Sequence, residues 1–120
     1  MKNVLLLVLL FACTTATAQT NDEDQIRSIL TAQTAYWNKG DIENFMKGYW
    51  NNDSLMFIGK SGITYGYKNT LENYKKGYPT RTAMGTLTFS HIQLKRISAD
   101  VYFVIGQWHL ARPKEGDVGG

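Results

Sequence analysis

The stretch that decides the fold runs from Tyr36 to Gly66, YWNKGDIENFMKGYWNNDSLMFIGKSGITYG. The order Asn38, Lys39, Gly40 is typical of a helix end, because glycine readily takes the positive φ that follows a last turn. Asp41 can then accept backbone N–H hydrogen bonds at the start of a second helix. The segment therefore predicts two helices joined in a tight hairpin.

The same stretch predicts a β-hairpin after the second helix. Apolar residues recur at helical spacing from Ile42 to Trp50, and the polar run from Asn51 to Asp53 breaks that pattern. Leu55 to Ile58 is typical of a short apolar strand, Gly59 to Gly62 of a turn, and Ile63 to Tyr65 of a returning strand.

Weaker patterns flank this stretch on both sides. Asp22 and Gln25 form a capping box ahead of a helix whose apolar face contains Trp37, with Gln33 as its polar exception. Downstream, we expect a short third helix from Tyr67 to Lys76. Two long strands should follow, over Met84 to Ile97 and Val101 to Arg112, joined by a turn at residues 98–100.

This order of helix, Asn-x-Gly-Asp, helix, Tyr-x-x-x-Asp and strand resembles the nuclear transport factor 2-like superfamily, and within it the SnoaL-like and ketosteroid-isomerase-like domains of unknown function. The resemblance covers about Ile26 to Gly120. It implies an α+β, cone-shaped fold, in which a curved antiparallel sheet wraps an N-terminal helix hairpin and a short third helix. Family members usually have one or two further strands beyond residues 116–120, so a single C-terminally truncated domain is expected over residues 19–120.

Residues 1–18 have the pattern of a signal peptide. Lys2 precedes the apolar run Val4 to Ala12, and Ala16 to Ala18 make a small-residue cleavage site before Gln19. We therefore expect a protein exported to the periplasm or secreted. Cys13, the single cysteine, offers the alternative of a lipoprotein anchored to the membrane, and no other membrane contact is expected.

Composition excludes several functional classes. The net charge of +3 comes from scattered basic residues, whereas nucleic-acid binding requires a clustered basic face. No nucleotide-binding or nucleophile-elbow motif is present, and no cofactor is expected. His91 and His109 have no carboxylate at ligand spacing, so no metal site is predicted.

The resemblance also suggests where proton-transfer chemistry would lie. Ketosteroid isomerases use a carboxylate base on the first strand and a tyrosine donor on the first helix. Alignment on Asn38, Gly40 and Asp41 puts the base near Ile58 and the donor near Gln33. Isoleucine cannot transfer a proton, so the isomerase mechanism is not expected, although Gln33 can donate a hydrogen bond to a carbonyl.

His109 is the candidate catalytic residue because imidazole titrates near neutral pH. Gln107 lies two residues away and shares its strand face if the strand is regular. A bulge at Gly106 would instead turn His109 outward and move Trp108 to the other face. A purely structural or solvent-facing role is the alternative for His91 and His109.

Aromatic side chains favour a pocket for a flat apolar molecule, with a plain hydrophobic core as the alternative. Three functions follow: binding of a small apolar or aromatic ligand without catalysis, a SnoaL-like enzyme acting by proton transfer or hydrolysis, and a dimerisation module. A homodimer is expected in each case. The predicted ligand-binding residues are Gln33, Trp37, Trp50, His91, Gln107 and Trp108.

Overall fold

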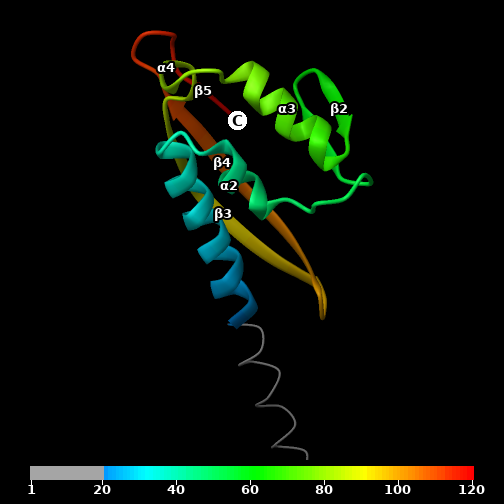
Figure 1. Cartoon of the computed structure of the whole chain (residues 1–120). Helices are drawn as coiled ribbons and strands as arrows, with labels where there is room; N and C mark the ends of the chain where they lie inside the picture. Colours follow the sequence, from blue (N-terminus) through cyan, green and yellow to red (C-terminus); the bar gives the residue numbers. More distant parts are fainter. Residues whose placement is uncertain (1–20) are drawn as a thin grey trace, which may run out of the picture.

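The computed structural model describes residues 21–120 and shows an α+β fold (Figure 1). The proposed signal peptide, its cleavage site after Ala18 and Cys13 lie outside the described residues. An N-terminal helix over residues 21–38 is followed by α2 (Ile42–Phe45), a 3-10 turn η1 (Met46–Gly48), β1 (Met56–Gly59), β2 (Gly62–Tyr65), α3 (Tyr67–Gly77), α4 (Arg81–Met84), β3 (Thr86–Ser98), β4 (Val101–Ala111) and β5 (Val118–Gly119). The predicted α+β class is confirmed.

The predicted helix hairpin is present. Gly40 has a φ of 80°, and the Asp41 side chain accepts a hydrogen bond from the Asn44 backbone N–H at 3.0 Å. The Asn44 side-chain amide also donates to Asp41, at 2.6 Å, and this bond together with the backbone bond holds the pKa of Asp41 below its usual range, because both stabilise the carboxylate. Asp22 does not cap the first helix, since residue 21 is already helical.

The second helix is shorter than predicted. It ends at Phe45, passes through η1, and reaches extended backbone at Tyr49. Gly48 allows this tight course, because a Cβ there would lie 2.6 Å from the Gln33 amide nitrogen. Trp50 therefore falls outside the apolar stripe and is 61% exposed.

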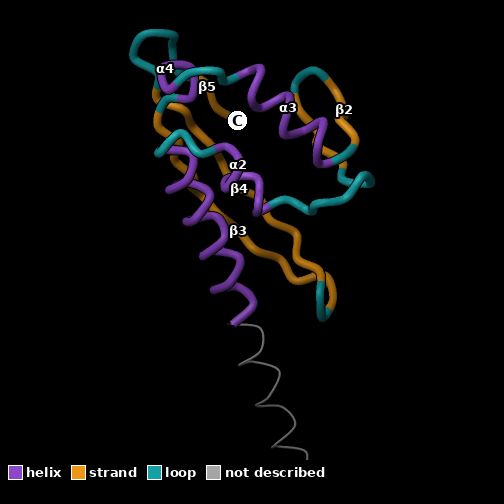
Figure 2. The backbone as a smooth tube through the Cα atoms, in the orientation of Figure 1, coloured by secondary structure: helices purple, strands orange, loops and turns teal. Residues whose placement is uncertain are grey.

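Strands β3 and β4 form a long antiparallel hairpin, which Figure 2 shows as the longest pair of neighbouring orange segments. Its turn was predicted, but Met84 belongs to α4 rather than to the strand. The register shifts twice on β3: His91 and Ile92 oppose the single residue Gly106 at what we call the β3 bulge, and Ile97 is an extra residue near the turn. Of the two alternatives for β4, the regular strand is therefore the one observed, and the bulge at Gly106 is not.

Regular alternation along β4 gives the β3–β4 hairpin two distinct faces. The inner face is defined by Leu87 and Leu110, which are cross-strand partners and almost fully buried. By alternation it also contains Phe89, Val104 and Trp108. The outer face contains Val101, Phe103, Ile105, Gln107 and His109.

The inner face meets the helices in one hydrophobic core. Asn38 bridges the two layers, because its side chain donates to the Leu87 carbonyl and accepts from the Leu87 N–H. The buried core residues are Trp37, Ile42, Phe45, Met46, Met84, Leu87 and Leu110. β5 pairs with β4 only at His109 and Leu110, and Gly120 adds two backbone bonds to Trp108.

Candidate functional site

A cluster of aromatic rings lies where the N-terminal helix, the α2–η1 segment, β1 and α3 meet. Neighbouring ring centroids are 5.0 to 6.3 Å apart, and most pairs meet edge to face, which suits the charge distribution of aromatic rings. The members of this aromatic cluster are Trp37, Phe45, Tyr49, Phe57, Tyr74 and Tyr78.

Two phenols form the polar centre of the aromatic cluster. The hydroxyl oxygens of Tyr49 and Tyr74 are 2.8 Å apart. Two phenols carry two donor protons, and the bond between them uses one. Neither phenol has another hydrogen-bond partner in the part of the chain that the structure describes. One O–H donor is therefore free to bind an acceptor oxygen.

The same phenols stay protonated in the physiological range. Burial raises the pKa of Tyr74 far above its usual range, and the neighbouring Tyr49 adds to this effect. Burial also raises the pKa of Tyr49, although the hydrogen bond from Tyr74 offsets part of the rise. The pair therefore acts as a neutral hydrogen-bond donor rather than as a base.

Of the predicted ligand-binding residues, Trp37 is a member of the aromatic cluster and Gln33 lies beside it. Gln33 is only 8% exposed, and its amide nitrogen lies 3.3 Å from the Phe45 carbonyl oxygen to which it donates. The Trp37 indole N–H donates to the Met84 carbonyl at 3.1 Å. Both polar groups are thus already paired with backbone atoms, and the Trp37 ring forms part of the core.

Trp108 lies on the inner face of β4, opposite Phe89. It is 38% exposed, so part of its indole ring is open to a ligand. Gly120 lies directly beside the Trp108 ring, as shown by the 2.9 Å that would separate a Cβ on Gly120 from the indole nitrogen.

The other predicted residues do not join this group. Gln107 and His109 are exposed on the outer face, His91 is exposed at the β3 bulge with a φ of 53°, and Trp50 is exposed after η1. The sequence-predicted set is therefore divided between the helix layer and both faces of the β3–β4 hairpin.

His109 has a carboxylate partner that the sequence analysis missed. Its Nε2 lies 3.1 Å from Oδ2 of Asp117, and Oδ1 of Asp117 accepts the Arg112 N–H at 2.8 Å. That backbone bond, together with His109, lowers the pKa of Asp117. The only signal in the sequence was an aspartate in a glycine-rich turn, and this gave no reason to pair it with His109.

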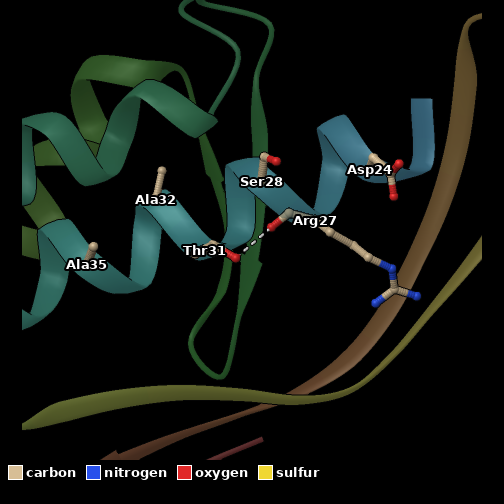
Figure 3. Close-up of a pocket in the computed structure, with 6 residues that line it drawn as sticks. All are labelled: Asp24, Arg27, Ser28, Thr31, Ala32 and Ala35. Carbon is tan, nitrogen blue, oxygen red and sulfur yellow. Dashed lines mark hydrogen bonds between the residues drawn. The ribbon is translucent and has the colours of Figure 1, made fainter. Parts of the chain in front are cut away.

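Two surface hollows lie elsewhere. One, of about 540 Å³, runs along the exposed side of the N-terminal helix, where its small side chains leave a shallow groove (Figure 3). It is lined by Asp24, Arg27, Ser28, Thr31, Ala32 and Ala35. The other, of about 250 Å³, lies beside α4 and the end of β4. Neither contains a residue predicted to bind a ligand.

Within residues 21–120, no three His, Cys, Asp or Glu side chains are grouped closely enough to hold a metal ion. No helix in this range combines the length and apolar character needed to cross a membrane.

Comparison with solved structures identifies a similar protein from Shewanella oneidensis MR-1, described as an NTF-2 like protein of unknown function. The two sequences are 37% identical, and the match covers 82% of this chain and 81% of that chain with a TM-score of 0.77. No protein-family model matches the sequence, and the comparison with curated proteins gives no match.

Proposed function

Because this chain belongs to the NTF-2-like proteins, we propose that it uses their fold to bind a small apolar or aromatic molecule that carries an acceptor oxygen. The ligand would lie against the aromatic cluster, with its oxygen at the Tyr49 and Tyr74 hydroxyls. Binding, rather than catalysis, is the role that these neutral phenols support.

The observation that carries this proposal is the free O–H donor inside the aromatic cluster. Aromatic walls supply most of the binding free energy for a flat ligand, and a polar group at one point fixes its orientation. The bond between the phenols also strengthens the remaining donor, because hydrogen bonds in a chain polarise one another. Gln33 and Trp37 would support this end of the ligand, and Trp108 would contact it from the inner face.

Native mass spectrometry of the protein exported from a bacterial host tests the proposal. The wild-type protein should retain a co-purified small molecule or take up added 2-naphthol, and the Tyr49→Phe/Tyr74→Phe variant should hold less of it. Tyr67→Phe is the matched control, because Tyr67 packs against the core outside the phenol pair. A wild-type protein that carries no small molecule and takes up no 2-naphthol would contradict the proposal.

A second candidate function is hydrolysis or proton transfer by His109. The specific observation in its favour is the contact with Asp117, because a carboxylate can orient an imidazole and stabilise its charged form. With 4-nitrophenyl acetate as the substrate, His109→Ala should reduce turnover to background while leaving the melting temperature nearly unchanged. Equal losses of turnover and stability would show that His109 is structural.

We also propose that the protein is exported after removal of residues 1–18, with lipidation at Cys13 as the alternative. The pattern of Lys2, Val4 to Ala12 and Ala16 to Ala18 supports export. The intact mass of the exported protein distinguishes the two forms: a chain starting at Gln19 supports cleavage, and a diacylglycerol-modified chain starting at Cys13 supports the lipoprotein.

A further inference from the structure

The β1–β2 hairpin has one anchored face and one exposed apolar face. On the anchored face, the Phe57 ring contacts Tyr74, and Thr64 accepts a hydrogen bond from Asn73 on α3. On the other face, two cross-strand pairs bring four large apolar side chains together. These are Met56 with Tyr65 and Ile58 with Ile63, all more than half exposed.

We call this surface the hairpin patch; it consists of Met56, Ile58, Ile63 and Tyr65. It is an exposed apolar surface suited to contact with another molecule. Ile58 is 73% exposed, the highest value among the exposed large hydrophobic residues of the described chain. Contiguous exposed apolar side chains of this kind mark sites of protein or membrane interaction. Because the opposite face already secures the hairpin to α3, the patch is not needed to hold the hairpin in place.

The charged residues between positions 54 and 71 are both lysines. Lys60 lies in the turn between the strands, and Lys68 lies in the first turn of α3. Residues 54–71 contain no aspartate or glutamate. Neither lysine forms an ion pair within residues 21–120. The stretch that carries the patch therefore combines apolar side chains with two positive charges, and the nearest acidic residues along the chain are Asp53 and Glu72.

An anionic lipid surface fits this combination best. Apolar side chains can enter the boundary between headgroups and acyl chains, while lysine ammonium groups remain at the lipid phosphates. The Tyr65 phenol suits the same interface, since its ring is apolar and its hydroxyl is polar. A second copy of the chain fits less well, because a two-fold contact of the two patches would set the same stretch, which has two lysines and no acidic side chain between residues 54 and 71, against itself.

We propose that the exposed face of the β1–β2 hairpin docks on anionic membranes, such as those containing phosphatidylglycerol. This contact is separate from any lipid attached at Cys13 and does not depend on the ligand site. It places the hairpin, rather than the helices, against the lipid.

Hydrogen–deuterium exchange of the full chain with vesicles tests this inference locally. Residues 4–12 are apolar and can bind lipid themselves, so total binding alone is not decisive. Vesicles of phosphatidylglycerol and phosphatidylcholine in equal parts should slow exchange in residues 56–65, and pure phosphatidylcholine vesicles should not. Unchanged exchange, or equal protection by both kinds of vesicle, would overturn the proposal.

Matched variants give a second, independent readout. Ile58→Ser should abolish the protection of residues 56–65 and weaken vesicle binding by about tenfold, as expected for an isoleucine that enters lipid. Ile29→Ser is the control, because Ile29 is also exposed but lies on the N-terminal helix. Lys60→Glu should weaken binding by a further factor of about five, whereas Lys114→Glu should not.

Two other outcomes would overturn the proposal. Equal effects of Ile58→Ser and Ile29→Ser would show that the hairpin patch has no special role. Loss of self-association in Ile58→Ser, with vesicle binding unchanged, would assign the patch to a second copy of the chain. Thermal unfolding of each variant confirms that the exposed substitutions leave the fold intact.

Discussion

At the scale of single residues, the positions that the sequence predicts best are those with a fixed local geometry. Gly40 and Asp41 are such positions, because a helix end and a helix start each require a particular backbone conformation or cap. The partner of His109 could not be predicted in this way. Asp117 reaches His109 only because the chain turns after β4 and returns beside it.

Asn38 offers a direct test of how the helix layer is joined to the sheet. Its side chain satisfies both the N–H and the carbonyl of Leu87, at 2.7 and 3.2 Å. Asn38→Ala should lower the free energy of unfolding by about 2 kcal/mol, because two part-buried backbone groups lose their partner. Urea denaturation measures the change. Asn51→Ala, at an exposed position, should stay within about 0.5 kcal/mol of wild type.

The Tyr49–Tyr74 pair should behave as one unit in a double-mutant cycle. Tyr49→Phe and Tyr74→Phe should each lower the free energy of unfolding by about 1 kcal/mol, because each leaves the other hydroxyl unpaired in an apolar site. The double variant should lose no more than one single variant does. Strictly additive losses, measured by urea denaturation, would show that the hydroxyls are not coupled.

At the scale of elements, the apolar patterns predict the strands and long helices well and their ends less well. The second helix was predicted through Trp50 because its apolar spacing continues, yet Gly48 and the close approach of Gln33 end it earlier. A bulge at Gly106 was one of two alternatives for this strand, because glycine often marks a bulge. The structure gives the extra residue to β3, and Gly106 accommodates the Ile92 side chain.

The β3 bulge makes Gly106 sensitive to substitution. A Cβ at Gly106 would lie 2.4 Å from the Ile92 Cδ1 atom, so Gly106→Ala forces Ile92 or the strand to move. The free energy of unfolding should fall by about 1 to 3 kcal/mol.

Gly77→Ala is the matched control for this change, because a Cβ at Gly77 meets no atom within 4 Å. It should leave stability unchanged or raise it by up to about 1 kcal/mol. Thermal unfolding that ranks the two variants in the opposite order would contradict the assigned register.

At the scale of the whole molecule, we propose that the expected homodimer forms through the outer face of the β3–β4 hairpin. Val101, Phe103 and Ile105 form a row of exposed apolar side chains on that face. Burial of such a row against a second copy would remove it from water. The expected homodimer therefore has a specific candidate interface.

Ile105→Asp should convert that dimer to a monomer, because it would place a carboxylate in the apolar contact. Sedimentation velocity at micromolar concentration measures the change in mass. Ile58→Asp is the matched control, since Ile58 is equally apolar and exposed but lies on the β1–β2 hairpin. A wild-type monomer, or equal effects of the two variants, would show that the outer face is not a dimer interface.

The arrangement of the whole molecule also decides which residues lie at the aromatic cluster, and the sequence predicted this only in part. The periodic patterns assigned the aromatic residues to helices and strands. The hydrogen bond between Tyr49 and Tyr74, however, depends on how α3 packs against the segment after η1. Gln107 was predicted to bind ligand and His109 to be catalytic, because alternation alone cannot show which face of a strand turns inward.

The central claim is that the free phenol donor selects an acceptor oxygen, and the most direct measurement compares 2-naphthol with naphthalene. Fluorescence titration should show that wild-type protein binds 2-naphthol about five- to tenfold more tightly, as expected for one hydrogen bond in an apolar site. In Tyr49→Phe/Tyr74→Phe this preference should disappear while naphthalene affinity is retained. An equal preference for 2-naphthol in both proteins would contradict the account.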